Sequence, residues 1–103
     1  LKLKKYEQAS LDANRALELD STLAVAYFVK GRSIGTHERL KEAIGYFDKA
    51  IAYSPGYGAA YYIRGLAKIH LKDTLNGCED LHQAAKLDFS MAERYISKFC
   101  GDE

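Results

Sequence analysis

The feature that most constrains this chain is a spacing of 34 residues that recurs along it. The residues that share this spacing are Ala16, Ala50 and Ala84; Tyr27, Tyr61 and Tyr95; Gly31 and Gly65; and Ala9, Ala43 and Gly77. A fixed period of 20 to 50 residues is typical of repeat proteins, in which each unit packs on its neighbours. The period therefore predicts successive copies of one supersecondary unit.

Residues 24–55 indicate what that unit is. In the second half, the apolar residues recur with helical spacing: they are Leu40, Ala43, Ile44, Phe47, Ala50 and Ile51. The first half shows the same spacing at Tyr27, Phe28, Gly31 and Ile34. Residues 36–39 are polar and predict a turn, and Pro55 stops the second helix. The unit is a helical hairpin, and with one proline and no alternating strand pattern the chain is predicted to be all-α.

This unit resembles the tetratricopeptide repeat, a helix–turn–helix of 34 residues. The central unit matches the family pattern at Tyr27, Gly31, Ala43, Phe47, Ala50 and Pro55. The next unit matches at Tyr61, Gly65, Gly77, Leu81 and Ala84, with Phe89 where proline is usual. Lys30, Arg64 and Lys68 replace residues that are usually apolar, so we expect a wetter packing surface there. The resemblance implies a right-handed α-solenoid of antiparallel helix pairs, with about five helices.

The repeat pattern divides the chain as follows. We expect one tetratricopeptide-repeat domain over residues 1–103, with full repeats at 21–55 and 56–89. Residues 1–20 would be the second half of a repeat, in which 1–5 end a first helix and its turn. The helix partner of the Ala9 and Ala13 face would then be missing, which suggests a fragment of a longer array or a face covered by another molecule. Residues 90–103 would form a C-terminal capping helix that begins with a Ser90–Glu93 capping box.

Composition narrows the possible partners and locations. The formal net charge is +1, so we expect no nucleic-acid partner, because phosphate binding needs a basic face. No apolar run approaches a membrane span, so membrane insertion is not expected. No targeting segment is recognisable, although one could precede Leu1, since the chain lacks an initiating Met. The compartment stays undecided: the cytoplasm is slightly favoured, and an oxidised cysteine pair would fit a periplasmic or secreted protein.

The resemblance implies a protein–protein interaction scaffold whose first helices line a concave groove for a peptide or protein segment. The groove positions that it carries over to this chain are Val25, Phe28, Arg32, Tyr62, Leu66, Ile69, His70, Glu93 and Ile96, with Thr36 and Ala59 beside them. Phe28 and Tyr62 could instead pack on neighbouring side chains. One family subtype clamps a terminal carboxylate, but the matching positions here lack suitable donors: they are Phe28, Val29, Ala59 and Ile63. We therefore expect an apolar or aromatic ligand segment.

Two cysteines and one histidine are candidates for further sites. Cys78 and Cys100 lie at similar depths on either side of a predicted turn near 88–89, so they form either a disulfide or two buried thiols. Cys78 and His82 share a helix face, but two ligands do not make a zinc site, so no metal is expected. Residues 31–35 lack the lysine of a phosphate-binding loop. We find no catalytic constellation and predict neither an enzyme nor a cofactor.

The alternative function is structural. The half-repeat at residues 1–19 could be completed by a second copy of the chain or by upstream repeats, which would make a homo-oligomer or an extended array.

Overall fold

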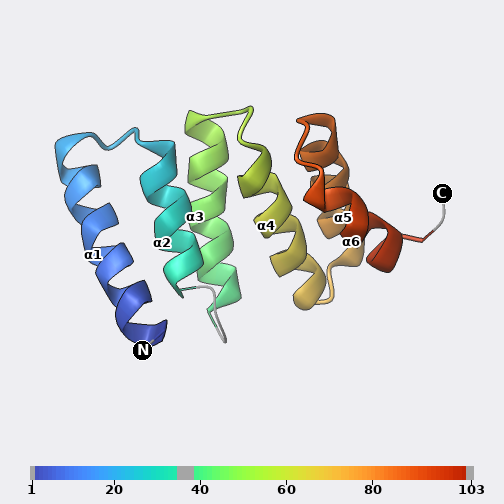
Figure 1. Ribbon diagram of the computed structural model, residues 1–103, viewed down its shortest axis with the longest axis horizontal. Coiled ribbons are helices and arrows are strands. Elements are labelled where there is room, and N and C mark those ends of the chain that lie inside the picture. Colours follow the sequence, from blue (N-terminus) through green and yellow to red (C-terminus); the bar gives the residue numbers. More distant parts are fainter. Residues whose placement is uncertain (1, 35–38, 102–103) are drawn as a thin grey trace. The chain divides into compact units, whose positions relative to one another are not determined.

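The computed structural model describes residues 2–34 and 39–101 (Figure 1). Helices account for all the regular structure in these ranges: α1 (Lys2–Leu19), α2 (Ala24–Ile34), α3 (Leu40–Tyr53), α4 (Gly58–His70), α5 (Thr74–Lys86) and α6 (Met91–Phe99). The all-α prediction is confirmed, and six described helices are close to the expected number of about five. Residues 36–38 of the predicted turn at 36–39 lie outside the described ranges.

The beginning of the chain differs from the prediction. Helix α1 is continuous from Lys2, so there is no turn between Lys2 and Lys5. The physical reason is that this segment holds only lysine and leucine, which are good helix formers, and no glycine or proline that would end a helix.

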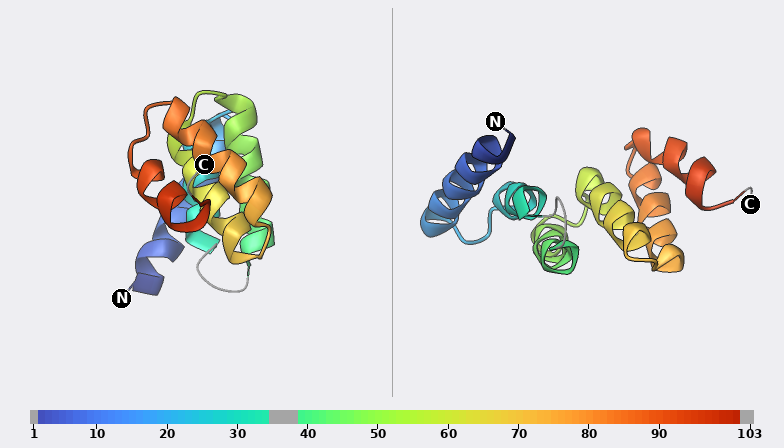
Figure 2. Two further views of the ribbon diagram at one scale, coloured as in Figure 1. Left: turned by 90° about the vertical axis from the view of Figure 1, so that its right-hand side faces the viewer. Right: turned by 90° about the horizontal axis from the view of Figure 1, so that it is seen from below.

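The chain forms two compact units, Leu1–Pro55 and Gly56–Glu103. The division falls between the two predicted full repeats. In the first unit α1 packs on α2 and α2 packs on α3, side by side in the view from below (Figure 2), and successive helices run in opposite directions (Figure 1). Its core consists of small residues around one aromatic ring: Ala13, Ala26, Ala43, Phe47 and Ala50. Gly31 is buried against that ring, and a Cβ placed on it would lie 2.6 Å from Phe47 Cε1.

Ala13 corrects one expectation. Its face was predicted to lack a covering helix, but Ala13 is only 5% exposed and Ala9 is half-buried. The reason is that α2 packs against α1 and serves as its partner within the unit. The open face that motivated self-assembly is therefore smaller than expected, and a homo-oligomer stays a prediction.

In the second unit α4 packs on α5 and α5 packs on α6. Its core is built from Tyr62, Leu81, Ala84 and Ala92, three of which are fully buried. Helices α4 and α5 approach closely where two glycines face each other. A Cβ on Gly65 would lie 2.7 Å from the carbonyl oxygen of Gly77, so the helix contact depends on the missing side chain.

Helices α4 and α5 end with the same backbone conformation. Lys72 and Asp88, each just beyond a helix, have φ angles of 72° and 66°. The amide of the following residue then donates back into the helix, from Asp73 to Lys68 at 2.8 Å and from Phe89 to Ala84 at 3.0 Å. These bonds form Schellman motifs, which satisfy carbonyls at the helix end. Phe89 thus supplies an N–H that the proline usual at this position lacks.

The predicted capping box at the start of α6 is not formed. Ser90 has helical backbone angles and makes no side-chain hydrogen bond to the helix end, so it does not cap with Glu93. The reason is local: Ser90 already continues the turn that follows Phe89, and its carbonyl accepts the Glu93 amide at 3.1 Å.

Candidate functional site

In the first unit, the predicted groove positions lie on α2. Val25 is 61% exposed and Arg32 is also exposed, whereas Phe28 is half-buried. The Phe28 ring lies 5.8 Å from the ring of Phe47, and the Arg32 guanidinium lies 5.8 Å from the Phe28 ring. Phe28 therefore contacts both Phe47 of the core and Arg32, which lies one turn further along α2. Thr36 falls outside the described residues.

In the second unit, three predicted positions surround one hollow of about 660 Å³. We call it the α4–α6 depression, and its lining residues are Leu66, Ile69, His70, Lys72, Thr74, Tyr95 and Phe99. Leu66, Ile69 and His70 come from α4, where their spacing places them on one side of the helix. The predicted residues Leu66, Ile69 and His70 are thus brought together, and α6 supplies the opposite wall.

Helix α6 presents two aromatic rings to this depression. Tyr95 and Phe99 are one helical turn apart, and their rings are stacked with centroids 6.1 Å apart. The Nζ atom of Lys98 lies 5.4 Å from the centroid of the Phe99 ring, and Lys72 is one of the lining residues. The depression therefore combines apolar side chains with cationic groups. The sequence pattern pointed to the α4 residues but not to the two aromatics of α6.

Tyr62 was predicted as a groove residue, and its position corrects that prediction. The side chain is only 7% exposed, and its ring lies 4.9 Å from Phe89 and 5.7 Å from Tyr95. Tyr62 is a core residue, as the alternative interpretation allowed. It is buried because α6 and the turn before it fold over α4 at this point, which repeat spacing alone does not specify.

Glu93 and Ile96 also lie apart from the α4 residues. They line a second hollow of about 530 Å³, the α5–α6 depression, together with His82, Ala85, Lys86 and Ser97. The predicted single groove is therefore divided in this unit. The helical turn explains the division, because Glu93 and Ile96 point to a different side of α6 from Tyr95 and Phe99.

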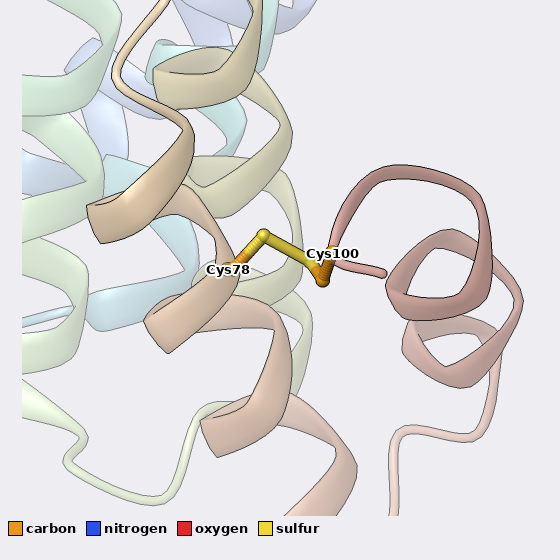
Figure 3. Close-up of a disulfide and its surroundings, with 2 residues drawn as sticks. All are labelled: Cys78 and Cys100. Atoms are coloured by element: carbon orange, nitrogen blue, oxygen red, sulfur yellow. A yellow bond between two sulfur atoms is a disulfide. The ribbon is translucent and has the colours of Figure 1, made fainter. Parts of the chain in front are cut away.

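Cys78 and Cys100 form a disulfide (Figure 3). Cys78 projects from α5, and Cys100 follows the last residue of α6, with the two Cα atoms 5.8 Å apart. The structure thus takes the disulfide rather than the pair of buried thiols. The bond joins the end of α6 to the first half of α5.

An ion cluster between α4 and α5 was missed by the sequence analysis. Asp80 is 6% exposed and accepts two hydrogen bonds of 2.8 Å from Arg64, from Nε and from Nη2. Lys68 adds a contact of 3.0 Å from Nζ. Arg64 and Lys68 were noted as unusually polar for a packing surface, but Asp80, the residue that pairs with both, was not. The signal was present: two cations at i and i+4 call for a nearby anion if they are buried.

The described residues contain neither a cluster suited to a metal ion nor a helix suited to a membrane span. Across residues 2–34 and 39–101, no group of three or more His, Cys, Asp or Glu side chains could hold a metal ion. Within the same ranges, no helix is long and apolar enough to cross a membrane. The sulfur of Cys78 is committed to the disulfide, so it does not pair with His82 as a ligand.

Comparison with solved structures identifies the fold. The chain superposes on YrrB, described as a tetratricopeptide repeat protein with an unusual peptide-binding site, with a TM-score of 0.78 over 94% of this chain and 50% of that one. The chain has the tetratricopeptide repeat fold. The sequence identity with YrrB is 24%, so this likeness shows the fold, a tetratricopeptide solenoid.

Two curated proteins resemble the tetratricopeptide chain in sequence. Anaphase-promoting complex subunit 3 of Schizosaccharomyces pombe is 32% identical over 77% of this chain. The cell division cycle protein 27 homolog of Caenorhabditis elegans is 34% identical over 71% of it. The matches span only 12% and 9% of those proteins. No family model matches the chain. Proteins of this fold are generally non-enzymatic scaffolds for protein–protein interaction.

Proposed function

We propose that this tetratricopeptide repeat protein holds a peptide segment of a partner protein in the α4–α6 depression. The observation that carries the proposal is that Leu66, Ile69 and His70, expected to line a groove from their repeat positions, surround one hollow with Tyr95 and Phe99. Concave apolar sites with a few polar groups are where proteins bind ligands.

The lining defines what kind of segment fits. Leu66, Ile69 and the two stacked rings offer apolar contact for one large side chain. Lys72 in the lining and Lys98 beside Phe99 place positive charge at the edge, which attracts an acidic residue. A matching segment carries an aromatic or large aliphatic residue next to aspartate or glutamate. This agrees with the expected apolar ligand segment. The acidic residue of that segment would contact Lys72 and Lys98.

The test is selection from a random peptide library displayed on phage, with the chain immobilised under oxidising conditions. We expect the selected peptides to share a large apolar residue next to an acidic one. Phe99→Ser should lower the affinity for such a peptide at least tenfold, because one wall of the depression is lost.

Met91 provides a matched control. It also lies on α6 and is 52% exposed, but it does not line the α4–α6 depression. Met91→Ser should leave the affinity unchanged. Equal losses for Phe99→Ser and Met91→Ser would show that the peptide binds elsewhere.

A further inference from the structure

The disulfide and the proposed peptide site meet at the end of α6. Phe99, which lines the α4–α6 depression, is followed directly by Cys100, and Cys100 is bonded to Cys78 of α5 (Figure 3). The position of the Phe99 ring is therefore tied through one residue to a bond that a reductant can break.

The two halves of α6 are held by different interactions. At the start of the helix, Ala92 is fully buried, and the Tyr95 ring lies 5.7 Å from the buried Tyr62 ring. At the end, the residues from Ser97 to Phe99 are all exposed, with Phe99 at 39%. Residues 97–99 of the last turn are thus less buried than the start of the helix, and a helix of nine residues has little stability of its own. The disulfide is the covalent link between the end of this turn and α5.

From this arrangement we infer that the redox state of Cys78–Cys100 controls the α4–α6 depression, and hence the peptide binding on whose proposal this inference rests. With the disulfide formed, the last turn of α6 holds Phe99 against Tyr95 and the depression is complete. With the disulfide reduced, the last turn frays and Phe99 leaves the wall. Tyr95 stays in place, because it packs on the core.

The chemical step needs a dithiol reductant. One thiolate of the reductant attacks a sulfur of the pair, which forms a mixed disulfide and releases the other cysteine as a thiol. The second thiol of the reductant then displaces the bound cysteine and closes the reductant's own disulfide. Two electrons and two protons pass to the protein, which ends with thiols at positions 78 and 100. Both cysteines are partly exposed, so the reductant can reach them.

Amide hydrogen exchange, compared with and without dithiothreitol, tests the conformational part without any ligand. The Cys100 amide donates to the Ile96 carbonyl at 2.8 Å and reports directly on the last turn. We expect reduction to lower protection of residues 98–100 at least tenfold, while protection of the residues in α4 and α5 is kept. Unchanged protection, or loss of protection throughout α4 and α5, would overturn a local switch.

The binding part uses one peptide selected from the library on the oxidised chain. Reduction should weaken its affinity at least tenfold, and equal affinity in both states would overturn the inference. Cys78→Ser combined with Cys100→Ser should bind weakly and show no response to dithiothreitol in either measurement. If no peptide can be selected, the proposed function fails, and the exchange result alone decides whether the disulfide controls the last turn of α6.

Discussion

At the scale of single residues, Asp80 matters more for stability than its place in the repeat pattern suggests. It is buried between α4 and α5 and neutralises two cations, with Arg64 bound through two nitrogens. The side chains of Arg64 and Lys68 are themselves only 16% and 22% exposed. Removal of Asp80 would leave both cations in a site that water reaches poorly, which is more costly than the net stabilisation of the ion cluster itself.

We therefore predict that Asp80→Ala lowers the free energy of unfolding by about 3 kcal/mol, at the lower end of the range for a broken buried ion pair because the cations keep some hydration. Urea denaturation followed by circular dichroism measures this. Glu79→Ala is the matched control: Glu79 is the exposed neighbour on the same helix, and we expect a change within about 0.5 kcal/mol. Similar changes for the two variants would contradict the assigned role of Asp80.

Phe89 leads to a second prediction, in which the residue usual for the family is the harmful one. Phe89→Pro removes the N–H that donates to Ala84 and the ring that packs 4.9 Å from Tyr62. We expect a loss of at least about 2 kcal/mol in the free energy of unfolding. Phe89→Leu keeps the N–H and much of the apolar volume, so it should cost less in the same urea experiment. A proline variant as stable as the wild type would show that the Schellman bond is dispensable.

At the scale of the helix pairs, two glycines on α4 and α5 set the distance between these helices. The Gly65 position is closed by the backbone oxygen of Gly77, which cannot move aside as a flexible side chain could. Gly45 on α3 is the opposite case, because a Cβ placed there meets nothing within 4 Å. Packing therefore requires glycine at position 65 but not at position 45.

We predict that Gly65→Ala lowers the free energy of unfolding by about 1–3 kcal/mol, as overpacking usually does. Gly45→Ala should instead raise it by up to about 1 kcal/mol, because alanine has the higher helix propensity. Thermal denaturation of the two variants gives the signs directly. A stabilising Gly65→Ala would mean that α4 and α5 can separate without loss.

The same helix pairs show what the sequence could predict. The 34-residue spacing was enough for the helices and for the close approach at Gly65 and Gly77, because a repeat imposes both on every copy. It could not predict the Asp80 cluster, since the central copy has Tyr46 at the position of Asp80. Nor could it place Tyr62, whose burial depends on how the last helix folds over α4 after the turn at Asp88.

At the scale of the whole molecule, the chain is made of two compact units, and the peptide site proposed here lies within the second one. Predicted groove positions in the first unit, such as Val25 and Arg32, are exposed and remain predictions. The same holds for self-assembly through residues 1–19. The central claim is therefore narrower than a groove along the full array: one depression between α4 and α6 binds a partner segment.

Nuclear magnetic resonance tests this claim most directly. Backbone amide signals of the oxidised chain would be followed during titration with the selected peptide. We predict that the largest shifts fall at residues 66–74, from the end of α4 to the first residue of α5, and at Tyr95 and Phe99 of α6, while residues 7–19 of α1 are unaffected. Largest shifts at residues 82–86 of α5 and at Glu93 and Ile96, around the α5–α6 depression, or anywhere in α1, would contradict it.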